Sequence, residues 1–255
     1  MIFVAAGTQD GRELAGYLLE KGYDVVASVV SQYGQALLQS YPGIKINDKP
    51  LDEVGLREYL DNNKVECFVD ASHPYAANIS TNAMAACAKC GVPYIRFERE
   101  TSPLDYAKAH YVTDYKSAAQ KAGELGENIF LTTGSRSLAI FAQSEALKQK
   151  RIVCRILPEP EVIKEARELG FTPDNIIAMQ GPFSQELNKE LFIKYGADVV
   201  VTKNSGALGG ADTKFAAVKE LNLPLVVIDR PKVAYTNVTD SYEGVLEFIE
   251  KYKML

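Results

Sequence analysis

The chain has 255 residues, of which 47% are hydrophobic and 24% are charged, and its formal net charge is −5. This length exceeds that of the usual single-core domain and predicts two domains of a little over about 100 residues each. The negative charge argues against a broad nucleic-acid surface, and no apolar stretch approaches the roughly 18 residues that span a bilayer. We therefore expect a cytoplasmic protein with neither nucleic acid nor membrane as a partner.

The predicted elements alternate between strands and helices from the start of the chain. Residues 1–6 lack the basic segment of a signal peptide and are predicted as a first strand. The predicted strands of the first half are Ile2–Ala5, Asp24–Val30, Ile44–Ile46, Cys67–Asp70 and Tyr94–Phe97. The predicted helices of this half are Gly11–Lys21, Tyr33–Ser40, Asp52–Asn62 and Ala76–Cys90. Such alternation is typical of parallel sheets covered by helices.

A polar stretch around Pro103 interrupts the alternation and suits a linker. We therefore divide the chain into residues 1–103 and 104–255, to within about ten residues. The predicted strands of the second half are Asn128–Thr133, Arg151–Ile156, Asn175–Met179, Asp198–Thr202 and Leu225–Ile228. The predicted helices are Asp114–Leu125, Glu161–Leu169, followed by Gly170 as a left-handed cap, and Tyr242–Lys253, with further helices in the remaining gaps. The predicted fold class is α/β: two Rossmann-like lobes, each a mainly parallel sheet flanked by helices, with a cleft between the lobes.

The four cysteines do not form the pattern of a disulfide framework. Cys67 and Cys154 lie in predicted strands, and Cys87 and Cys90 lie in one predicted helix. A structural zinc site would need two more ligands at comparable spacing, and none follows. We expect reduced cysteines that pack in the core, and no metal site.

The loop after the first strand, Ala6–Arg12, is predicted to bind a dinucleotide. Gly7 and Gly11 let the backbone approach a pyrophosphate, and the Thr8 hydroxyl adds a hydrogen bond. Arg12 completes this group of cofactor-binding residues. The usual G-x-G-x-x-G spacing is absent, so an ordinary strand-to-helix turn with Thr8 as N-cap is the alternative.

The end of the second strand bears on the choice of cofactor. Many NAD-binding folds place a carboxylate there to hold the ribose 2′-hydroxyl. Residues 27–33 contain Ser28 and Ser31 but no acid, so a 2′-phosphate would not be repelled. We therefore expect NADPH or NADH, with Ser28 and Ser31 among the cofactor-binding residues.

The polar turn Asp70–Ala76 follows a buried strand, where α/β proteins bind ligands. Ser72 is a candidate for cofactor binding, and Asp70 and His73 are candidates to donate or orient a proton. The alternative is structural: Asp70 caps the next helix, and His73 bonds to backbone. The other histidine, His110, lies near the predicted domain boundary, where we expect a structural role.

Short polar elements recur after the predicted strands of both halves. They are Gly7-Thr8 with Arg12, the turn 70–76 with Ser80 and Asn82, Arg96 with Glu98-Arg99, Thr133-Gly134, Gly181-Pro182-Phe183, Lys203–Gly206 with Lys214, and Arg230-Pro231. In order and spacing this set resembles the precorrin-6A reductase family, which includes enzymes acting on cobalt-precorrin-6A. The resemblance implies a two-lobed Rossmann-like fold, a nicotinamide cofactor, and reduction of one double bond of precorrin-6A or its cobalt form to the corresponding precorrin-6B in cobalamin synthesis.

The implied corrinoid substrate is an apolar macrocycle fringed with carboxylates, so its pocket needs cations at the rim. The substrate-binding candidates at strand ends are Tyr75, Arg96, Arg99, Gly134, Ser135, Arg136, Lys203, Ser205, Gly206, Lys214 and Arg230. Most of them lie in the second half, which makes residues 104–255 the substrate lobe and residues 1–103 the dinucleotide-binding lobe. Glu98 has a simpler role as the partner of an arginine.

Hydride transfer needs positioning and a proton from a side chain, water or the substrate. His73, Asp70 and Lys203 are the catalytic candidates, and the sequence does not single out one as the acid. Two other classes stay open: a non-catalytic dinucleotide-sensing regulator, and a two-lobed tetrapyrrole enzyme that uses no nicotinamide. The resemblance also leaves room for transient contacts with neighbouring pathway enzymes.

Overall fold

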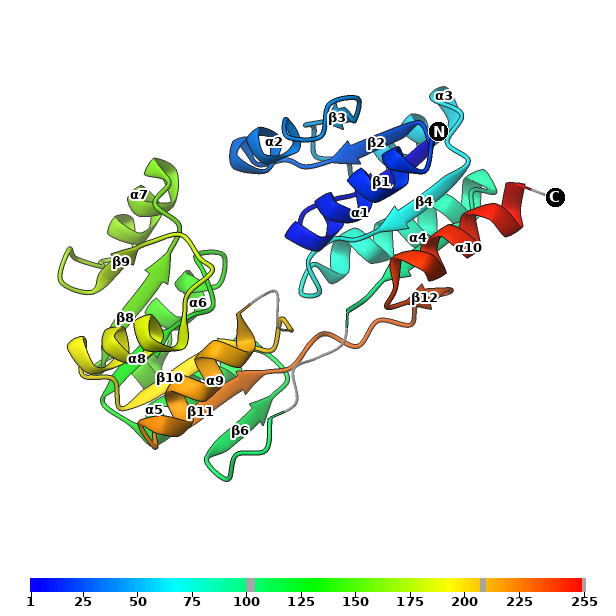
Figure 1. The fold of residues 1–255 in the computed structure, drawn as a ribbon. Coiled ribbons are helices and arrows are strands. Elements are labelled where there is room, and N and C mark those ends of the chain that lie inside the picture. The colour runs from blue at the N-terminus through cyan, green and yellow to red at the C-terminus, as the bar shows by residue number, and fades with distance from the viewer. Residues whose placement is uncertain (100–103, 207–209, 254–255) are drawn as a thin grey trace. The chain divides into compact units, whose positions relative to one another are not determined.

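The computed structural model describes residues 1–99, 104–206 and 210–253. The chain divides into two compact units (Figure 1). Unit 1 comprises Met1–Glu100 together with Pro231–Leu255, and unit 2 comprises Thr101–Arg230. Each unit is an α/β sandwich with one six-stranded sheet, and every recorded strand pair is parallel.

The sheet of unit 1 has the strand order β12-β5-β4-β1-β2-β3. Its strands are β1 (Ile2–Ala5), β2 (Val25–Ser28), β3 (Lys45–Asn47), β4 (Cys67–Asp70), β5 (Tyr94–Phe97) and β12 (Val238–Thr239). Its helices are α1 (Gln9–Glu20), α2 (Gln32–Leu38), α3 (Glu53–Asn62), α4 (Ala77–Cys90) and α10 (Tyr242–Lys253). Successive side chains of a strand point to opposite faces of the sheet. In β1, Ile2 therefore packs in the core under α1 and α10, and Phe3 packs in the core under α3 and α4.

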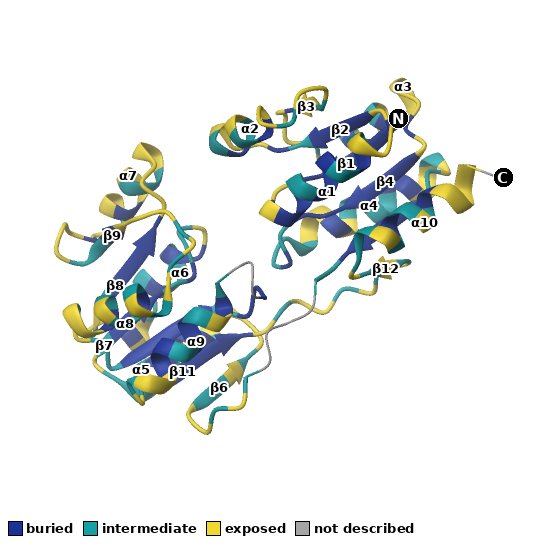
Figure 2. Cartoon of the chain, in the orientation of Figure 1, coloured by how far each residue is buried: buried dark blue, intermediate teal, exposed yellow. Residues whose placement is uncertain are grey.

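The sheet of unit 2 has the order β6-β11-β10-β7-β8-β9. Its strands are β6 (Ala109–Val112), β7 (Asn128–Leu131), β8 (Arg151–Ile156), β9 (Ile176–Ala178), β10 (Val199–Lys203) and β11 (Leu225–Ile228). Its helices are α5 (Tyr115–Leu125), α6 (Leu138–Ala142), the 3₁₀ helix η1 (Glu145–Leu147), α7 (Pro160–Glu168), α8 (Gln185–Lys194) and α9 (Ala211–Glu220). Figure 2 shows the central strands of both sheets as the most deeply buried parts of the chain.

The two sheets repeat one topology, and each takes its sixth strand from beyond its own run of five. In unit 2 the sixth strand is β6, which precedes the other strands in the chain and pairs with β11. In unit 1 it is β12, which follows the whole of unit 2 and pairs with β5. The prediction that residues 104–255 form one lobe is therefore wrong for residues 231–255. The register Val238↔Arg96 and the burial of Val245 and Ile249 of α10 against the first sheet hold that segment in unit 1.

Most predicted elements are confirmed to within a few residues, including β1, β4, β5, β8, β11 and α10 at their full bounds. The short strands β6 and β12 were missed, and His110 lies in β6. Helix α7 starts at Pro160, and Gly170 behind it has a φ of +92°, as predicted. The linker predicted around Pro103 lies outside the described residues.

The cysteines pack as predicted. Cys67, Cys87 and Cys154 are buried, and all four thiols are free. Burial raises the pKa of Cys67 and of Cys87 to about 12, so both stay protonated and unreactive at neutral pH. A separate finding concerns the helices: none within the described ranges is both long and apolar enough to cross a membrane.

Candidate functional site

Each sheet has a switch point at which the strand order reverses. In unit 1 the chain runs from β1 out to β3 and then returns to place β4 on the other side of β1. In unit 2 the same reversal places β10 on the other side of β7. Because all strands are parallel, the loops after these strands leave from one edge of their sheet. Such an edge at the reversal is where open α/β sheets bind ligands.

The loops after β1 and β4 meet at the switch point of unit 1. The Thr8 hydroxyl donates to the carbonyl of Ala71 at 3.1 Å and accepts from the Gly11 N–H at 3.0 Å. Thr8 is therefore the N-cap of α1, a role that the sequence had left open. Its one hydroxyl proton already serves Ala71, so it does not donate to a phosphate without breaking that bond.

The two glycines of this loop have different roles. A Cβ on Gly11 would lie 2.8 Å from the Ala71 carbonyl oxygen, closer than real Cβ atoms come. Gly11 thus lets α1 pack against the turn after β4, which corrects the expectation that it admits a ligand. Gly7 is exposed, and a Cβ there would meet no atom within 4 Å. The open backbone at Gly7 is the place where a pyrophosphate can approach.

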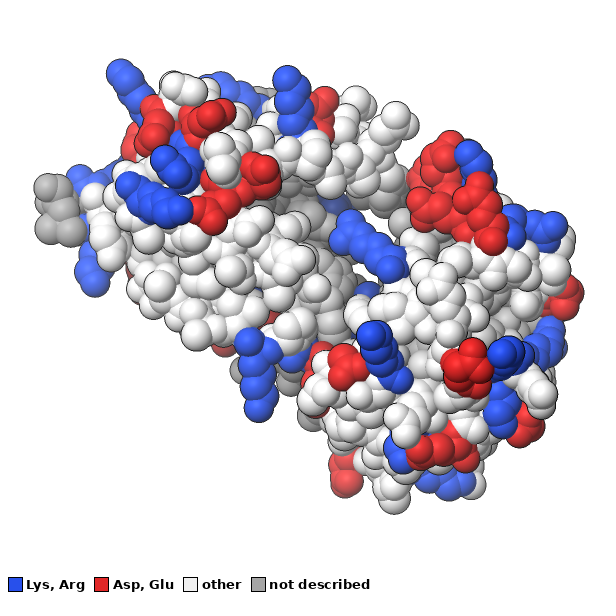
Figure 3. All heavy atoms as spheres, turned by 180° about the vertical axis from the view of Figure 1, so that it is seen from behind, with Lys and Arg blue, Asp and Glu red and all other residues white. Residues whose placement is uncertain are grey.

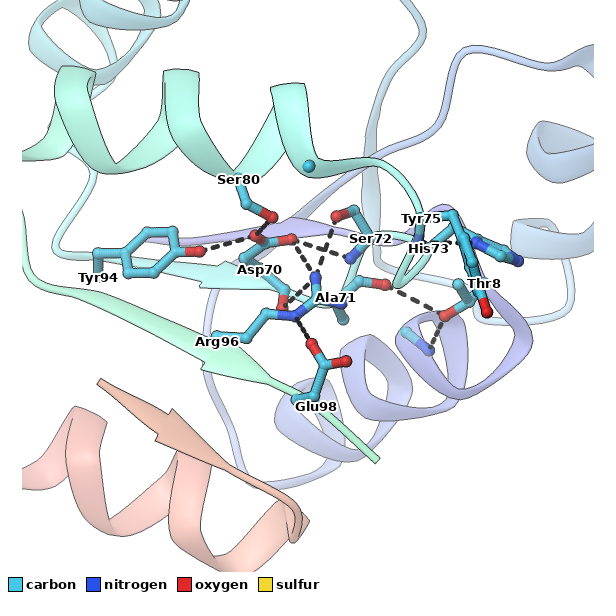
Figure 4. A network of polar contacts seen from close by, with 12 residues as sticks. Thr8, Asp70, Ala71, Ser72, His73, Tyr75, Ser80, Tyr94, Arg96 and Glu98 are labelled. Carbon is cyan, nitrogen blue, oxygen red and sulfur yellow. Dashed lines mark hydrogen bonds and ion pairs between the residues drawn. The ribbon is translucent and has the colours of Figure 1, made fainter. Parts of the chain in front are cut away.

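Asp70 lies at the centre of a buried polar network (Figure 4). Its carboxylate accepts hydrogen bonds from the Ser72 N–H (3.0 Å), the Ser80 hydroxyl (2.5 Å) and the Tyr94 hydroxyl (2.7 Å). It also forms an ion pair with Arg96 at 2.8 Å, and both side chains are almost fully buried, Asp70 at 0% and Arg96 at 1% exposure. The network ties the end of β4 to β5 and to α4.

This environment keeps Asp70 ionised. Burial alone would raise the pKa of its carboxyl, but the Arg96 guanidinium and the three donated hydrogen bonds hold that pKa below the usual range. Asp70 therefore has no proton to give near neutral pH, which argues against its predicted role as an acid. It does not cap α4 either, because the N-cap position there is Ala76, without a side-chain cap.

Arg96 was expected at a substrate-binding rim and is instead an internal residue of unit 1. Its Nε donates to Glu98 Oε2 at 2.7 Å, and its Nη1 donates to the Ser72 hydroxyl at 3.0 Å. The expectation that Glu98 pairs with an arginine is confirmed. The Ser72 N–H donates to Asp70 and its hydroxyl oxygen accepts from Arg96, so Ser72 shapes the turn through both groups.

His73 and Tyr75 are half-buried on the turn that this network supports. The Nδ1 atom of His73 accepts from the Tyr75 N–H at 3.2 Å, and the two rings lie 5.7 Å apart. The predicted backbone bond of His73 is therefore present. The bond fixes the orientation of the ring on the turn.

Three of the four remaining predicted residues of unit 1 are held by local partners. Ser28 accepts from the Asn47 side-chain amide at 3.0 Å, and Ser31 caps α2 by accepting from the Gly34 N–H at 3.0 Å. Arg99 pairs with Asp10 at 3.0 Å. Arg12 lies in the first half of α1, half-buried. The sequence analysis did not predict Asn47 as the partner of Ser28. The available signal was a polar residue at the end of the short strand β3.

The corresponding edge of unit 2 is formed by the loops after β7 and β10. Ser135 and Arg136 follow Gly134, whose φ of +80° requires glycine and whose missing Cβ would meet open space. After β10, Ser205 and Gly206 are buried, and the Arg230 Nε donates to the Asn204 carbonyl at 3.1 Å. The structure thus brings together the residues that the sequence predicted for this lobe.

Cations gather at this edge, and one of them was missed. Burial, together with Arg136, lowers the pKa of Lys203 to about 8. Burial, with Arg155 and Lys203 nearby, lowers the pKa of Lys214 to about 7. Burial also lowers the pKa of Arg155 to about 10. The signal for Arg155 was a charged residue within the apolar strand 151–156.

Over the face in view in Figure 3, acidic and basic side chains are mixed. After burial, the second cause that lowers the pKa of Lys203 is the nearby Arg136, and for Lys214 it is the nearby Arg155 and Lys203. Like charges held together in a poorly hydrated place are favoured once an anion neutralises them. The edge of unit 2 is therefore suited to an anionic ligand.

The fold and these two edges define a class: an α/β protein of two Rossmann-like units, one with an open glycine loop at its switch point and one with clustered cations. A model of the family "Precorrin-6x reductase CbiJ/CobK" matches residues 1–250. The cobalt-precorrin-6A reductase of Priestia megaterium is 39% identical over 247 residues, which cover 96% of each chain. The precorrin-6A reductase of Rhodobacter capsulatus is 31% identical and covers 97% of this chain and 95% of its own.

A solved structure, "CobK precorrin-6A reductase", superposes with a TM-score of 0.80 at 29% identity and covers 98% of this chain and 96% of its own. The chain belongs to the precorrin-6A reductase family. It is an oxidoreductase of cobalamin biosynthesis with a Rossmann-like fold, and membership in a reductase family implies a reduced nicotinamide as the electron donor.

Proposed function

We propose that this enzyme transfers a hydride from NADPH or NADH to one double bond of precorrin-6A or its cobalt form and yields the corresponding precorrin-6B. The match to reductases of these two substrates along the full chain carries the proposal. A non-catalytic regulator or a nicotinamide-independent enzyme would not account for that match.

Unit 1 fits a dinucleotide. The Gly7 backbone is open to solvent at the switch point, next to the N-terminus of α1, where backbone N–H groups favour a pyrophosphate. In this proposal Gly7, Ser28 and Arg12 contact the cofactor, which supplies the hydride when bound. Thr8, Gly11, Ser31 and Ser72 act indirectly, because their polar groups or their missing Cβ shape the loops.

Unit 2 fits the macrocycle. Its clustered cations suit carboxylates. The loop residues Gly134, Ser135, Ser205 and Gly206 lie on the two loops that carry these cations, and the N–H groups of Ser205 and Gly206 are used to shape their loop. In this proposal Arg136, Lys203, Lys214 and Arg230 bind substrate carboxylates. Tyr75 and Arg99 are the substrate-binding candidates of unit 1.

The proton that completes the reduction has a different source from Asp70. Lys203, with a pKa of about 8, is close to the working pH that suits a general acid. His73, held by its backbone bond, orients the reacting partners. We propose Lys203 as the residue to test for proton transfer and His73 as a positioning residue.

An anaerobic assay tests the proposal. The purified enzyme should oxidise NADH or NADPH, followed at 340 nm, only when precorrin-6A or cobalt-precorrin-6A is present. A folded enzyme that oxidises neither cofactor with either substrate would refute the proposal.

The choice of cofactor has its own test, because Ser28 ends β2 where an acid would repel a 2′-phosphate. The substitution Ser28→Asp should raise the KM for NADPH at least tenfold and leave the KM for NADH within about threefold. The matched control is Ser40→Asp, which adds the same charge at an exposed serine just beyond α2. Equal effects of both substitutions would mean that the end of β2 does not contact the ribose.

A further inference from the structure

Arg155 is a deeply buried cation of unit 2, and its described contacts are all uncharged. Only 7% of it is exposed, although it lies within β8 among apolar neighbours. Its Nη1 donates to the Asn188 side-chain oxygen at 2.8 Å, and the Phe183 ring lies 3.8 Å from its guanidinium carbon. An amide and an aromatic ring orient a guanidinium but do not neutralise it.

Its partner Asn188 is itself held in place. The Asn188 amide nitrogen donates to the Ser184 carbonyl at 2.8 Å and approaches the Thr213 hydroxyl at 3.4 Å. Asn188 is fully buried, so its side-chain oxygen has a fixed direction. The Arg155 guanidinium is therefore pre-positioned by α8, the loop before it and α9.

The guanidinium keeps donors for a ligand. A guanidinium has five N–H groups, and one hydrogen bond accounts for Nη1 alone. Among the described residues, the Nε and Nη2 atoms of Arg155 have no hydrogen-bond partner, and neither atom is sealed from solvent. Those nitrogens therefore reach the surface in a poorly hydrated place, where a charge-assisted bond is strong.

A second cation and an apolar rim lie beside Arg155. Lys214, in the first turns of α9, is also only 7% exposed and lies close enough to Arg155 for the two charges to repel. Leu157 and Met179 directly follow the paired strands β8 and β9 and are 44% and 38% exposed. The Met179 N–H donates to the carbonyl of Ile156, the residue before Leu157. Two cations beside exposed apolar side chains match a carboxylate carried on an apolar ring.

We infer that Arg155, oriented by Asn188 and Phe183 and paired with Lys214, is the anchor for one carboxylate of the corrin-type substrate, with Leu157 and Met179 against the ring edge. The inference rests on the proposed function and adds a specificity-determining residue to it. A guanidinium fork binds a carboxylate through two parallel N–H bonds, which a lysine does not reproduce.

Isothermal titration with two corrins tests the anchor without turnover. Cobyrinic acid carries free carboxylates, whereas cobinamide carries amides on the same kind of ring. The wild-type enzyme should bind cobyrinic acid more tightly than cobinamide. Arg155→Met should weaken cobyrinic acid roughly ten- to a hundredfold, the range for a lost charge-assisted bond, and leave cobinamide nearly unchanged. Arg155→Lys should fall between them, and it decides the matter if the methionine variant does not fold.

The matched control is Arg151→Met on the same strand. Arg151 is exposed and donates to the backbone carbonyls of Tyr195 and Asp174, so its loss should not change corrin binding. Equal affinity of the wild-type enzyme for both corrins, an unchanged preference in the Arg155 variants, or an equal loss in Arg151→Met would each overturn the inference. In the reductase assay, Arg155→Lys should raise the KM for the macrocycle and not that for the nicotinamide. An enzyme without reductase activity whose corrin preference still depends on Arg155 would refute the proposed reaction and not the anchor.

Discussion

Replacing Asp70 by Asn should be strongly destabilising, although the two side chains have the same shape. The substitution removes a negative charge that is fully buried and lies 2.8 Å from the buried Arg96 guanidinium. It retains an oxygen for the Ser72 N–H and for Arg96. The Ser80 and Tyr94 hydroxyls can rotate to accept from the new amide group, so the loss is mainly electrostatic.

The structure sets the size of the effect. Removing one partner of a buried ion pair costs about 3–5 kcal/mol, because the other charge is left uncompensated. Arg96 keeps a second carboxylate, Glu98, at 2.7 Å, and the Glu98 side chain is 19% exposed. We therefore expect Asp70→Asn to lower the free energy of unfolding by about 3 kcal/mol, at the low end of that range. Asp70→Ala should cost more, because it also leaves three donors without an acceptor.

Urea unfolding followed by circular dichroism measures the effect, with hydrogen exchange at β4 and β5 to assign it to unit 1. Arg96→Met in the same background should cost less than it does alone, because the double variant buries no unpaired charge. The pKa of Asp70 is depressed in the folded state, so its contribution is present above the unfolded value of 3.8 and is lost as the pH falls through the folded value. A loss below about 1 kcal/mol, or additive single effects, would refute the reasoning.

Three further predictions follow from the same geometry. Gly11→Ala should destabilise unit 1 by about 1–3 kcal/mol in thermal or urea unfolding, since its Cβ would lie 2.8 Å from the Ala71 carbonyl oxygen. Gly7→Ala, whose Cβ would meet no atom within 4 Å, should leave stability unchanged and weaken nicotinamide binding in a fluorescence titration. The pKa of Lys214 is about 7 in the folded enzyme against an ordinary 10.5, so the free energy of unfolding rises with pH between those values. Lys214→Met should abolish this rise and stabilise the enzyme at pH 6. An unchanged dependence of stability on pH in this variant would contradict the lowered pKa of Lys214. His73→Ala should lower kcat/KM of the reductase without abolishing it, because the ring positions rather than reacts, and complete loss in a folded variant would restore a catalytic role.

Much of the fold was predictable because the signals are local. The alternation of apolar strands and amphipathic segments requires only neighbouring residues, and it located ten of the strands to within a few positions. The helix starts were equally local: Thr8, Ser31, Asp52, Asp114 and Ser184 each accept a hydrogen bond from the backbone N–H three residues on. The strands β6 and β12 were missed because each is short, partly exposed and stabilised by a partner distant in sequence.

The candidate site was predictable in its location and less so in its chemistry. Parallel strands place their following loops at one edge, so the polar turns after β1, β4, β7 and β10 could be named from the sequence. The sequence did not predict which polar groups of these turns already bond within the protein. The Thr8 hydroxyl and the space at Gly11 are taken by Ala71 on the loop after β4, and the Ser72 N–H is taken by the Asp70 carboxylate.

Arg96 and Arg155 show where the limit lies. Each is an arginine inside an apolar strand, and the sequence alone determined that both strands are buried and that each carries a charge toward the carboxyl end. Only the tertiary structure decided their roles. Arg96 meets the carboxylates of Asp70 and Glu98, whereas Arg155 meets an amide and an aromatic ring. The periodicity of a strand reports that a side chain is buried, but the charge that faces it comes from segments brought near by folding, and that charge separates an internal ion pair from an anchor for a ligand.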